Sequence, residues 1–218
     1  YCTAVSSGTA GLHMALKACG VKKDEIVCIP SFTFIATANA VSHCGAETWL
    51  IDIDEESWTM NPELLEYELK NKTVRREGQT YHKESGKRVA AIMPVYTLGM
   101  PAHMDEIKHI GEKYGLAVIA DAAAAIGAKY KGKDIGLLAD ATVFSFNGNK
   151  TVTCGGGGAI VSNQEETIKL AKHLSTTARC GIMYDHDMVG YNYRMTNLQA
   201  AVGCAQMERI QEFLSKKK

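Results

Sequence analysis

Short apolar runs alternate with segments of helical periodicity along this chain, and this alternation restricts its fold more than any other feature. Five runs rich in β-branched residues read as buried strands: "EIVCIP" at 25–30, "AETWLIDI" at 46–53, "RVAAIMPV" at 88–95, "GLAVIAD" at 115–121 and "ATVFSF" at 141–146. Strands separated by helix-length stretches form βαβ units, which build a mainly parallel sheet covered on both faces. The sequence therefore predicts an α/β fold.

Helical patterns fill the stretches between these runs. Over 9–20 the apolar residues recur at the spacing of one helix face: Leu12, Ala15, Leu16 and Cys19. Gly20 follows as a helix stop, and Asn61 with Pro62 marks the start of another helix. Three more helices are expected, at 103–115, 167–178 and 196–214. The charged segment 71–88 is expected to be an exposed excursion before the next strand.

Charge and cysteine content narrow the range of partners and compartments. The 218 residues include 24 Lys plus Arg and 24 Asp plus Glu, a balance that argues against a dominant surface for nucleic acid or anionic membrane. No apolar run reaches the ~18 residues that a membrane-spanning helix needs. The given sequence shows no basic segment followed by an apolar one, as a secretion signal would, so a secreted protein is not expected. The seven cysteines are scattered without a C-x-x-C pair, which predicts reduced thiols and a cytoplasmic protein. The first residue, Tyr1, and the ending "EFLSKKK" suggest a part of a longer polypeptide.

Two motifs near expected strand ends could bind a ligand that carries both a phosphate and a positive charge. In open α/β sheets, ligands gather beyond the carboxyl ends of the strands. The turn "SSGTAGLH" at 6–13 leads into a helix whose first amides and dipole favour a phosphate, although such turns also cap many helices. Asp121 ends an apolar strand and precedes four alanines. It is either a helix cap or a carboxylate that pairs with a cationic ring atom of a flat ligand.

A lone lysine lies in an unusually bare turn. Lys150 stands in "FSFNGNKTVTCGGGG", five residues after Ser145, and its flanks lack the charge density of a surface loop. A lysine in a partly desolvated pocket loses its proton more readily and can form a Schiff base with a carbonyl. The alternative is a solvated loop lysine with no such role.

Together these residues match the three requirements of pyridoxal phosphate (PLP). Its phosphate needs an anchor, its aldehyde an amine, and its ring nitrogen a carboxylate that keeps the ring protonated as an electron sink. The 6–13 turn, Asp121 and Lys150 supply these groups in order along the chain. The joint pattern is far more specific than any single part, so the sequence predicts a PLP site.

At these motifs the sequence resembles the DegT-type nucleotide-sugar aminotransferases, which are fold-type I PLP enzymes. The resemblance runs essentially from end to end, through "SSGTAGLHMAL", "PSFTFIATANAV", "IADAAAAIGAKYKGKDIG", "FSFNGNKTVTCGGGGAIVSN" and "GYNYRMTNLQAAVGCAQMERIQEFL". It is strongest with the branch that aminates C4 of 4-keto-6-deoxy nucleotide sugars, the LegC and perosamine synthase types. It implies that 1–218 is a large PLP-binding domain with a mostly parallel mixed sheet flanked by helices. Most of a small C-terminal domain would be missing, and 196–218 would lead toward it.

The resemblance also implies roles for individual residues. Lys150 would hold the cofactor as a Schiff base and shuttle protons, while Asp121 would pair with the ring nitrogen. Phe34 would stack on the ring face. Three residues would hold the phosphate: Gly8, Thr9 and Ser145. Asn192, in "GYNYRM", would reach the phosphate in the neighbouring subunit of a homodimer with shared active sites, although "GYNYRMTN" also reads as the entry to the last helix.

Three features depart from the family's pattern. Ala124 stands where relatives usually carry Gln, Glu or His near the cofactor's phenolic oxygen. Tyr96 stands where many carry His near the sugar pocket, and the 71–88 excursion is longer than usual. A separate motif, "DHD" at 185–187, resembles a metal site, but one short loop supplies too few converging ligands. No metal is therefore expected.

The expected function is PLP-dependent transfer of the amino group of glutamate to the 4-keto carbon of a nucleotide-linked 6-deoxy sugar, for polysaccharide or glycan biosynthesis. Two alternatives remain open. One is a non-catalytic regulator or ligand-binding protein that retains the fold. The other is a PLP-dependent sugar dehydratase, although such relatives carry histidine in place of Lys150. A nicotinamide-binding domain is not favoured, because "CGGGG" matches G-x-G-x-x-G poorly and no helical pattern follows it.

Overall fold

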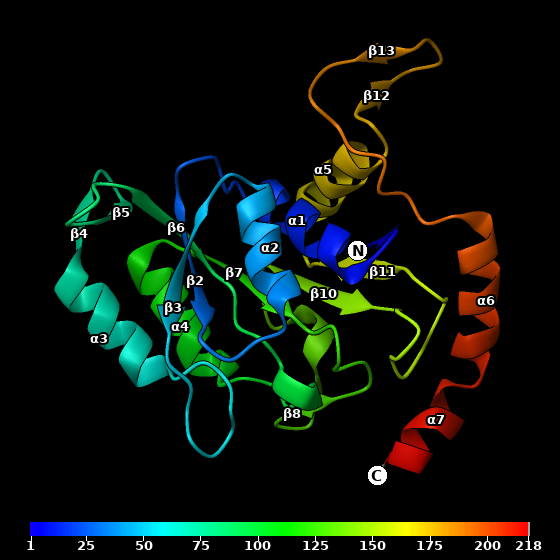
Figure 1. The fold of residues 1–218 in the computed structure, drawn as a ribbon, viewed down its shortest axis with the longest axis horizontal. Coiled ribbons are helices and arrows are strands. Elements are labelled where there is room, and N and C mark those ends of the chain that lie inside the picture. The colour runs from blue at the N-terminus through cyan, green and yellow to red at the C-terminus, as the bar shows by residue number, and fades with distance from the viewer. Residues whose placement is uncertain (218) are drawn as a thin grey trace.

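One nine-stranded β-sheet runs through the computed structural model, which describes residues 1–217 (Figure 1). Its strands are β1 (Cys2–Val5), β2 (Ile26–Pro30), β3 (Glu47–Ile51), β4 (Thr73–Arg76), β5 (Gln79–His82), β6 (Arg88–Ile92), β7 (Ala117–Asp121), β10 (Ala141–Ser145) and β11 (Gly158–Val161). The main order is β1-β11-β10-β7-β6-β2-β3. The strands from β10 to β3 in this order run parallel, whereas β11 is antiparallel to both β1 and β10. The sheet is mostly parallel but mixed, and the predicted α/β class is confirmed.

Helices cover both faces of this sheet. They are α1 (Gly8–Ala18), α2 (Ile35–His43), α3 (Pro62–Lys72), α4 (Met104–Tyr114) and α5 (Glu165–Ser175). The last two helices of the described chain, α6 (Asn197–Glu208) and α7 (Ile210–Lys217), lie to one side of the sheet and bury no residue (Figure 1). On one face, α1 contacts α2 and α5, and Leu12 of α1 shares a buried core with Val143 of β10. On the other face α3 contacts α4, and Leu69 and Ile107 belong to a second core. Consecutive residues of β2 alternate between the two cores, as the pleat of a strand buried on both sides requires.

The helices begin where side chains cap their free backbone amides. Ser7 accepts a hydrogen bond from the amide of the third residue of α1 at 3.1 Å. Asn61 caps two amides of α3, and Pro62 occupies the first turn, where a missing N–H costs nothing. Thr196 and Gln199 form a reciprocal capping box at the start of α6.

Segment 71–88 differs from the prediction, because most of it is a β-hairpin that extends the sheet. Glu77 and Gly78 turn the chain between β4 and β5 with positive φ angles of 50° and 79°, as a tight two-residue turn requires. β5 then pairs antiparallel with the start of β6, and buried Thr80 donates a hydrogen bond to the carbonyl of Tyr114 at 2.5 Å. The exposed charged residues of the hairpin obscured the strands in the sequence.

The helix expected at 196–214 is interrupted. Arg209 leaves the helical conformation, with φ −105° and ψ 9°, and separates α6 from α7. After this bend Leu214 lies against Gly127, and Lys217 Nζ donates to Thr151 Oγ1 at 2.6 Å. The chain therefore turns back to contact the body of the molecule, a tertiary effect that helical periodicity alone does not contain.

The remaining elements are short. Two 3₁₀ turns and two hairpins lie outside the main sheet: η1 (Thr97–Gly99), η2 (Ile135–Leu137), β8 (Lys129–Tyr130) with β9 (Lys133–Asp134), and β12 (Arg179–Cys180) with β13 (Asp185–His186). The β12–β13 hairpin projects away from the sheet, beyond the end of α5 (Figure 1). Of the helices within residues 1–217, none combines the length and apolarity needed to cross a membrane.

Candidate active site

A cavity of about 580 Å³ opens at the carboxyl ends of β7 and β10, beside the start of α1. Small-molecule sites typically occupy about 300–1,000 Å³. The lining includes six of the seven residues expected to bind the cofactor: Gly8, Thr9, Phe34, Asp121, Ser145 and Lys150. The fold therefore gathers these separate motifs at the edge of the sheet where α/β proteins bind ligands.

Asp121 is a buried carboxylate on a rigid part of the sheet. Its backbone amide donates to the carbonyl of Pro94 and its carbonyl accepts from the amide of Tyr96, each at 2.9 Å. Thr37 Oγ1 donates to Oδ2 at 2.7 Å, and the Ala123 amide donates to Oδ1 at 3.1 Å. These contacts hold the carboxyl group in one orientation.

The charge of Asp121 is costly in this environment. Burial raises the pKa of Asp121, while the bonds from Thr37 and Ala123 and the nearby Lys150 charge oppose this shift. A cation bound against the carboxyl group would remove much of the desolvation cost. Asp121 is therefore well suited to a protonated ring nitrogen.

The first turn of α1 and the end of β10 form a narrow cradle. A Cβ atom on Gly8 would lie 2.8 Å from Cβ of Ser145, closer than carbon atoms normally approach, so only glycine fits there. Ser145 is buried, and its Oγ accepts the Asn147 amide at 3.3 Å while its hydroxyl hydrogen stays available. The helix dipole adds a positive potential at this point. A helix N-terminus beside a hydroxyl suits a phosphate.

Lys150 and Phe34 both line the cavity, although they lie far apart in the sequence. Lys150 is half-buried in the turn after β10, and its amide donates to the Asn147 carbonyl at 3.0 Å. Phe34 is the N-cap residue of α2 and is 79% exposed at the cavity. The expected lysine thus lines the same cavity as Asp121, and an aromatic ring is available at the rim.

Asn192 is not among the residues that line this cavity. It is exposed and forms an isolated antiparallel bridge with Thr176, close to the end of α5. The same segment lies next to the 6–13 turn, because the Tyr193 carbonyl accepts a hydrogen bond from the Ser6 amide at 2.7 Å. The role expected for Asn192 involves another subunit and stays a prediction.

The two positions that depart from the family's pattern both lie in the cavity wall. Ala124 is exposed to the cavity and offers no polar side-chain atom. Tyr96 is buried, and neither its hydroxyl nor that of Thr97 has a hydrogen-bond partner among residues 1–217. Burial raises the pKa of Tyr96, so this phenol stays protonated at neutral pH.

Thr37 is the site residue that the sequence analysis missed. It lies on α2, far in sequence from Asp121, and its hydroxyl is 2.7 Å from that of Thr33. Because Thr37 donates to Asp121, Thr33 donates to Thr37, and the two form a short relay. The i, i+4 spacing of two threonines in "PSFTFIATANAV" is a weak signal for this pair.

Comparison with known proteins assigns the chain to a family. The sequence profile of the DegT/DnrJ/EryC1/StrS aminotransferase family matches residues 1–218. The chain belongs to this family. Membership agrees with the resemblance predicted from the sequence motifs.

Named relatives and solved structures agree with this membership. Over 219 residues the chain is 39% identical to a GDP-perosamine synthase of Escherichia coli O157:H7, covering 100% of this chain and 56% of that protein. It is also 39% identical to a GDP-perosamine synthase of Caulobacter vibrioides, covering 99% of this chain and 54% of that protein. The chain thus spans about half the length of the curated relatives it matches.

Two crystal structures support the same fold. A DegT/DnrJ/EryC1/StrS aminotransferase from Brucella abortus superimposes with a TM-score of 0.88 at 32% identity, over 97% of this chain and 55% of that one. NtdA from Bacillus subtilis, solved with bound cofactor PMP, gives a TM-score of 0.80 at 30% identity, over 96% of this chain and 44% of that one. The residues of the present cavity fit PLP. Within residues 1–217 buried Asp121 forms no ion pair, the Gly8–Ser145 cradle suits phosphate, and Lys150 supplies an amine.

Proposed function

We propose that this chain is the large, cofactor-binding domain, spanning 1–218, of a PLP-dependent aminotransferase. The enzyme would transfer the amino group of glutamate to the 4-keto carbon of a nucleotide-linked 6-deoxy sugar. The observation that carries the proposal is the single cavity in which Lys150, Asp121 and the Gly8–Ser145 cradle come together. The relatives named GDP-perosamine synthase favour a GDP-linked sugar as the acceptor.

Four parts of the cavity have defined tasks in the proposed reaction: Asp121, the α1 turn, Ser145 and Lys150. When bound, PLP supplies an electron sink for the charge that develops at the carbon attached to nitrogen. Asp121 keeps the ring nitrogen protonated, and Thr37 and Ala123 hold Asp121 in place. The α1 turn with Ser145 anchors the phosphate end.

Lys150 would act as the proton carrier. Its Nζ would remove a proton from the α-carbon of glutamate in the first half of the cycle and deliver one to C4 of the sugar in the second. Lys150 lies in the cavity lining, on a turn closed by the hydrogen bond from its backbone amide to the Asn147 carbonyl. Alternation of donor and acceptor predicts ping-pong kinetics.

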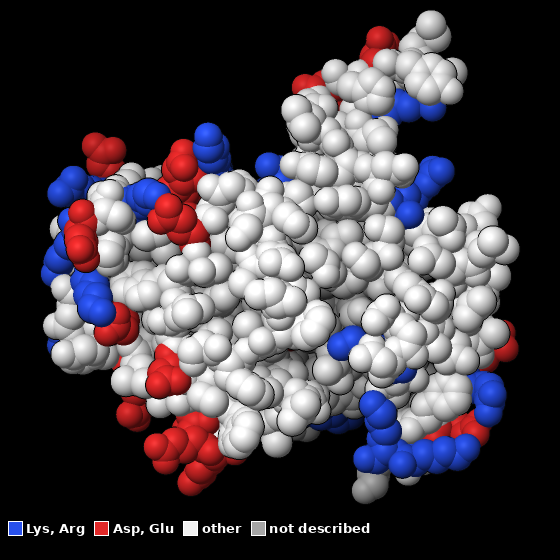
Figure 2. Space-filling view, in the orientation of Figure 1, with Lys and Arg blue, Asp and Glu red and all other residues white. Residues whose placement is uncertain are grey.

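A homodimer with shared active sites is part of this proposal. Asn192 is exposed next to the end of α5, where a second subunit can reach it. On the face shown in Figure 2 the charged side chains lie mainly near the edges, and the centre, over α1 and α2, is largely uncharged. Large apolar side chains are also exposed on α2 and α6, including Ile35 at 61% and Leu198 at 83%.

The proposed location is the cytoplasm. Cys28, Cys44 and Cys154 are buried free thiols that pack as small apolar side chains, which suits a reducing compartment. Nucleotide-sugar substrates and glutamate are the proposed partners.

The test is covalent attachment of the cofactor to Lys150 in the full-length protein. PLP would be added, trapped with borohydride, and the labelled peptide mapped by mass spectrometry. We expect the label on Lys150, its loss in Lys150→Ala, and its retention in Lys172→Ala, an exposed lysine on α5. Label on another lysine, or an unchanged label in Lys150→Ala, would contradict the proposal.

Turnover assays then separate an enzyme from a non-catalytic protein with the same fold. The full-length protein would be supplied with glutamate and GDP-, UDP- or dTDP-linked keto sugars. Formation of 2-oxoglutarate together with an amino sugar supports the transaminase. Cofactor attachment without turnover on any acceptor would support the ligand-binding alternative.

A further inference from the structure

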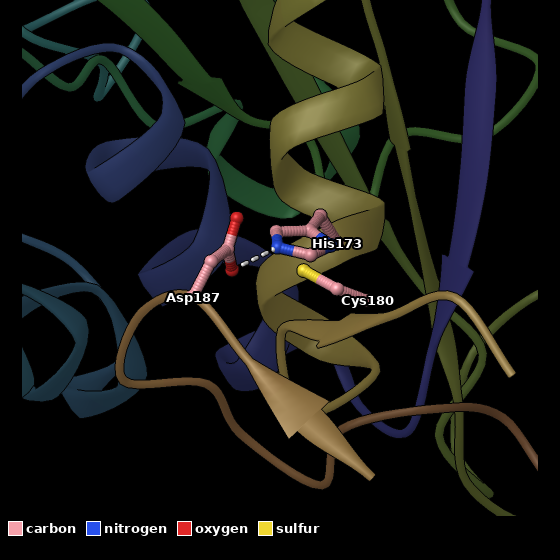
Figure 3. Close-up of side chains that lie close together, drawn as sticks. All are labelled: His173, Cys180 and Asp187. Atoms are coloured by element: carbon pink, nitrogen blue, oxygen red, sulfur yellow. Dashed lines mark hydrogen bonds and ion pairs between the residues drawn. The ribbon is translucent and has the colours of Figure 1, made fainter. Parts of the chain in front are cut away.

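Three side chains of different chemistry meet at the base of the β12–β13 hairpin, outside the cavity (Figure 3). His173 lies in the last turn of α5, Cys180 ends β12, and Asp187 follows β13. One potential ligand atom from each lies within 4.8 Å of the other two. The closest pair is His173 Nε2 and Asp187 Oδ1, at 2.7 Å.

The backbone imposes this convergence. Thr177 and Ala178 both adopt left-handed conformations, with φ 67° and 51°, and reverse the chain directly after α5. The Ala178 amide donates to the His173 carbonyl at 2.9 Å, which fixes the reversal. Such conformations are unfavourable for residues other than glycine and persist only where the surrounding structure holds them. The reversal therefore places the base of the hairpin next to the last turn of α5.

The ligand set is typical of a transition-metal site. An imidazole nitrogen, a thiolate and a carboxylate oxygen together suit zinc or a similar borderline ion better than magnesium or calcium. Tetrahedral coordination at usual zinc bond lengths places ligand atoms roughly 3.5 Å apart. The 2.7 Å between His173 Nε2 and Asp187 Oδ1 is shorter than this value, and the other two separations are at most 4.8 Å, so the three side chains would have to adjust when the ion binds.

We propose that His173, Cys180 and Asp187 bind a zinc-type divalent metal ion, with water as the fourth ligand. The 185–187 loop alone predicts no metal site, because it supplies one of these ligands, whereas α5 and β12 supply the other two. Binding breaks the Cys180 S–H bond and passes that proton to solvent as the sulfur–metal bond forms. The His173 ring also loses the Nε2 proton that it directs to Asp187, so that the neutral ring carries its hydrogen on Nδ1. The ion would cross-link the hairpin to α5.

This cross-link has a structural purpose. The tip of the hairpin carries Ile182, Met183 and Tyr184, which are 92%, 71% and 83% exposed. Two-residue strands have little stability alone. A metal at their base would hold the apolar tip in a fixed position relative to α5.

The test uses the full-length protein as purified, stripped of metal and then titrated. Zinc binding would be followed by calorimetry, and Co²⁺ binding by the thiolate-to-metal absorption band in a difference spectrum against the same protein without metal. We expect one ion per chain. His173→Gln, Cys180→Ser and Asp187→Asn should each weaken binding by at least about 100-fold, more than loss of an outer-shell partner does.

Two matched controls should bind metal as the unmodified protein does. His109→Gln alters an exposed histidine on α4, outside the hairpin and α5. Cys204→Ser removes an exposed cysteine elsewhere in the chain. Circular dichroism would show that every variant is folded. Absence of the thiolate band, or binding retained in Cys180→Ser, would overturn the proposal and leave His173 and Asp187 as an ion pair only.

Discussion

Replacing Gly8 by alanine tests the close approach on which the phosphate cradle depends. The added Cβ would lie 2.8 Å from Cβ of Ser145 and 3.1 Å from its Oγ. Carbon atoms are in favourable contact at about 3.5–4.0 Å, so α1 and β10 would have to separate by roughly 0.7 Å. Both elements are anchored in the same buried core, which resists such a shift.

Two opposing terms set the magnitude. Overpacking of this kind costs about 1–3 kcal/mol. Replacing a helical glycine by alanine recovers roughly 0.5–1 kcal/mol of backbone entropy. The clash outweighs the gain, and we expect a net loss of about 1–2 kcal/mol in the free energy of unfolding. For a chain of this length that is a fall in Tm of roughly 2–8 °C.

The assay is thermal unfolding of the cofactor-free protein, together with its affinity for PLP. Gly148→Ala is the control, because its Cβ would meet nothing within 4 Å. Ser145→Gly, introduced into Gly8→Ala, removes the clashing atoms and should restore much of the lost stability. Equal Tm values for the Gly8 and Gly148 variants, or no recovery in the double variant, would refute the steric argument.

Two predictions concern buried titratable groups. Since burial raises the pKa of Asp121, its charge destabilises the cofactor-free protein as the pH rises above the ordinary value of 3.8. Asp121→Asn should therefore raise the Tm of that form at pH 7 but not at pH 4, and weaken PLP binding; a lower Tm at pH 7 would contradict this. His13 is buried beside Tyr191 and His43, and burial, with His43 and Lys17, lowers its pKa from 6.5 to about 4. As the pH falls from 6.5 to about 4, the unfolded chain protonates His13 before the folded protein does, so the free energy of unfolding decreases over this range. His13→Phe should therefore flatten the dependence of the unfolding free energy on pH between pH 4 and 7. An unchanged slope in this variant would contradict the prediction.

Local signals in the sequence were sufficient for most of the elements that build the site. Asn61 and Pro62 cap α3 as predicted, and the strands that end at Asp121 and Ser145 follow directly from their β-branched runs. Because the carboxyl ends of parallel strands meet at one edge of a sheet, these strand ends also predicted that Asp121 and Ser145 lie in the same cavity.

The missed features depend on contacts between distant segments. β11 begins in the glycine run, where the residues have no β propensity, and it forms because β1 and β10 pair with both of its edges. Thr37 becomes a site residue only because the fold brings α2 within hydrogen-bond distance of Asp121, which lies 84 residues away in the sequence. The same holds for His173, which reaches Asp187 only through the reversal at Thr177 and Ala178.

Asp121 and Lys150, which would bind the ring nitrogen and the aldehyde of the cofactor, differ in how firmly the protein restrains them. Asp121 belongs to an interior strand, paired on both sides by β6 and β10, so displacing it means breaking the sheet. Lys150 lies on a turn, where small backbone rotations are cheap. Under the proposed function, a ligand bound to Asp121 would therefore stay in place while the Lys150 amine moves, and flexibility would be concentrated in the group proposed to carry the proton.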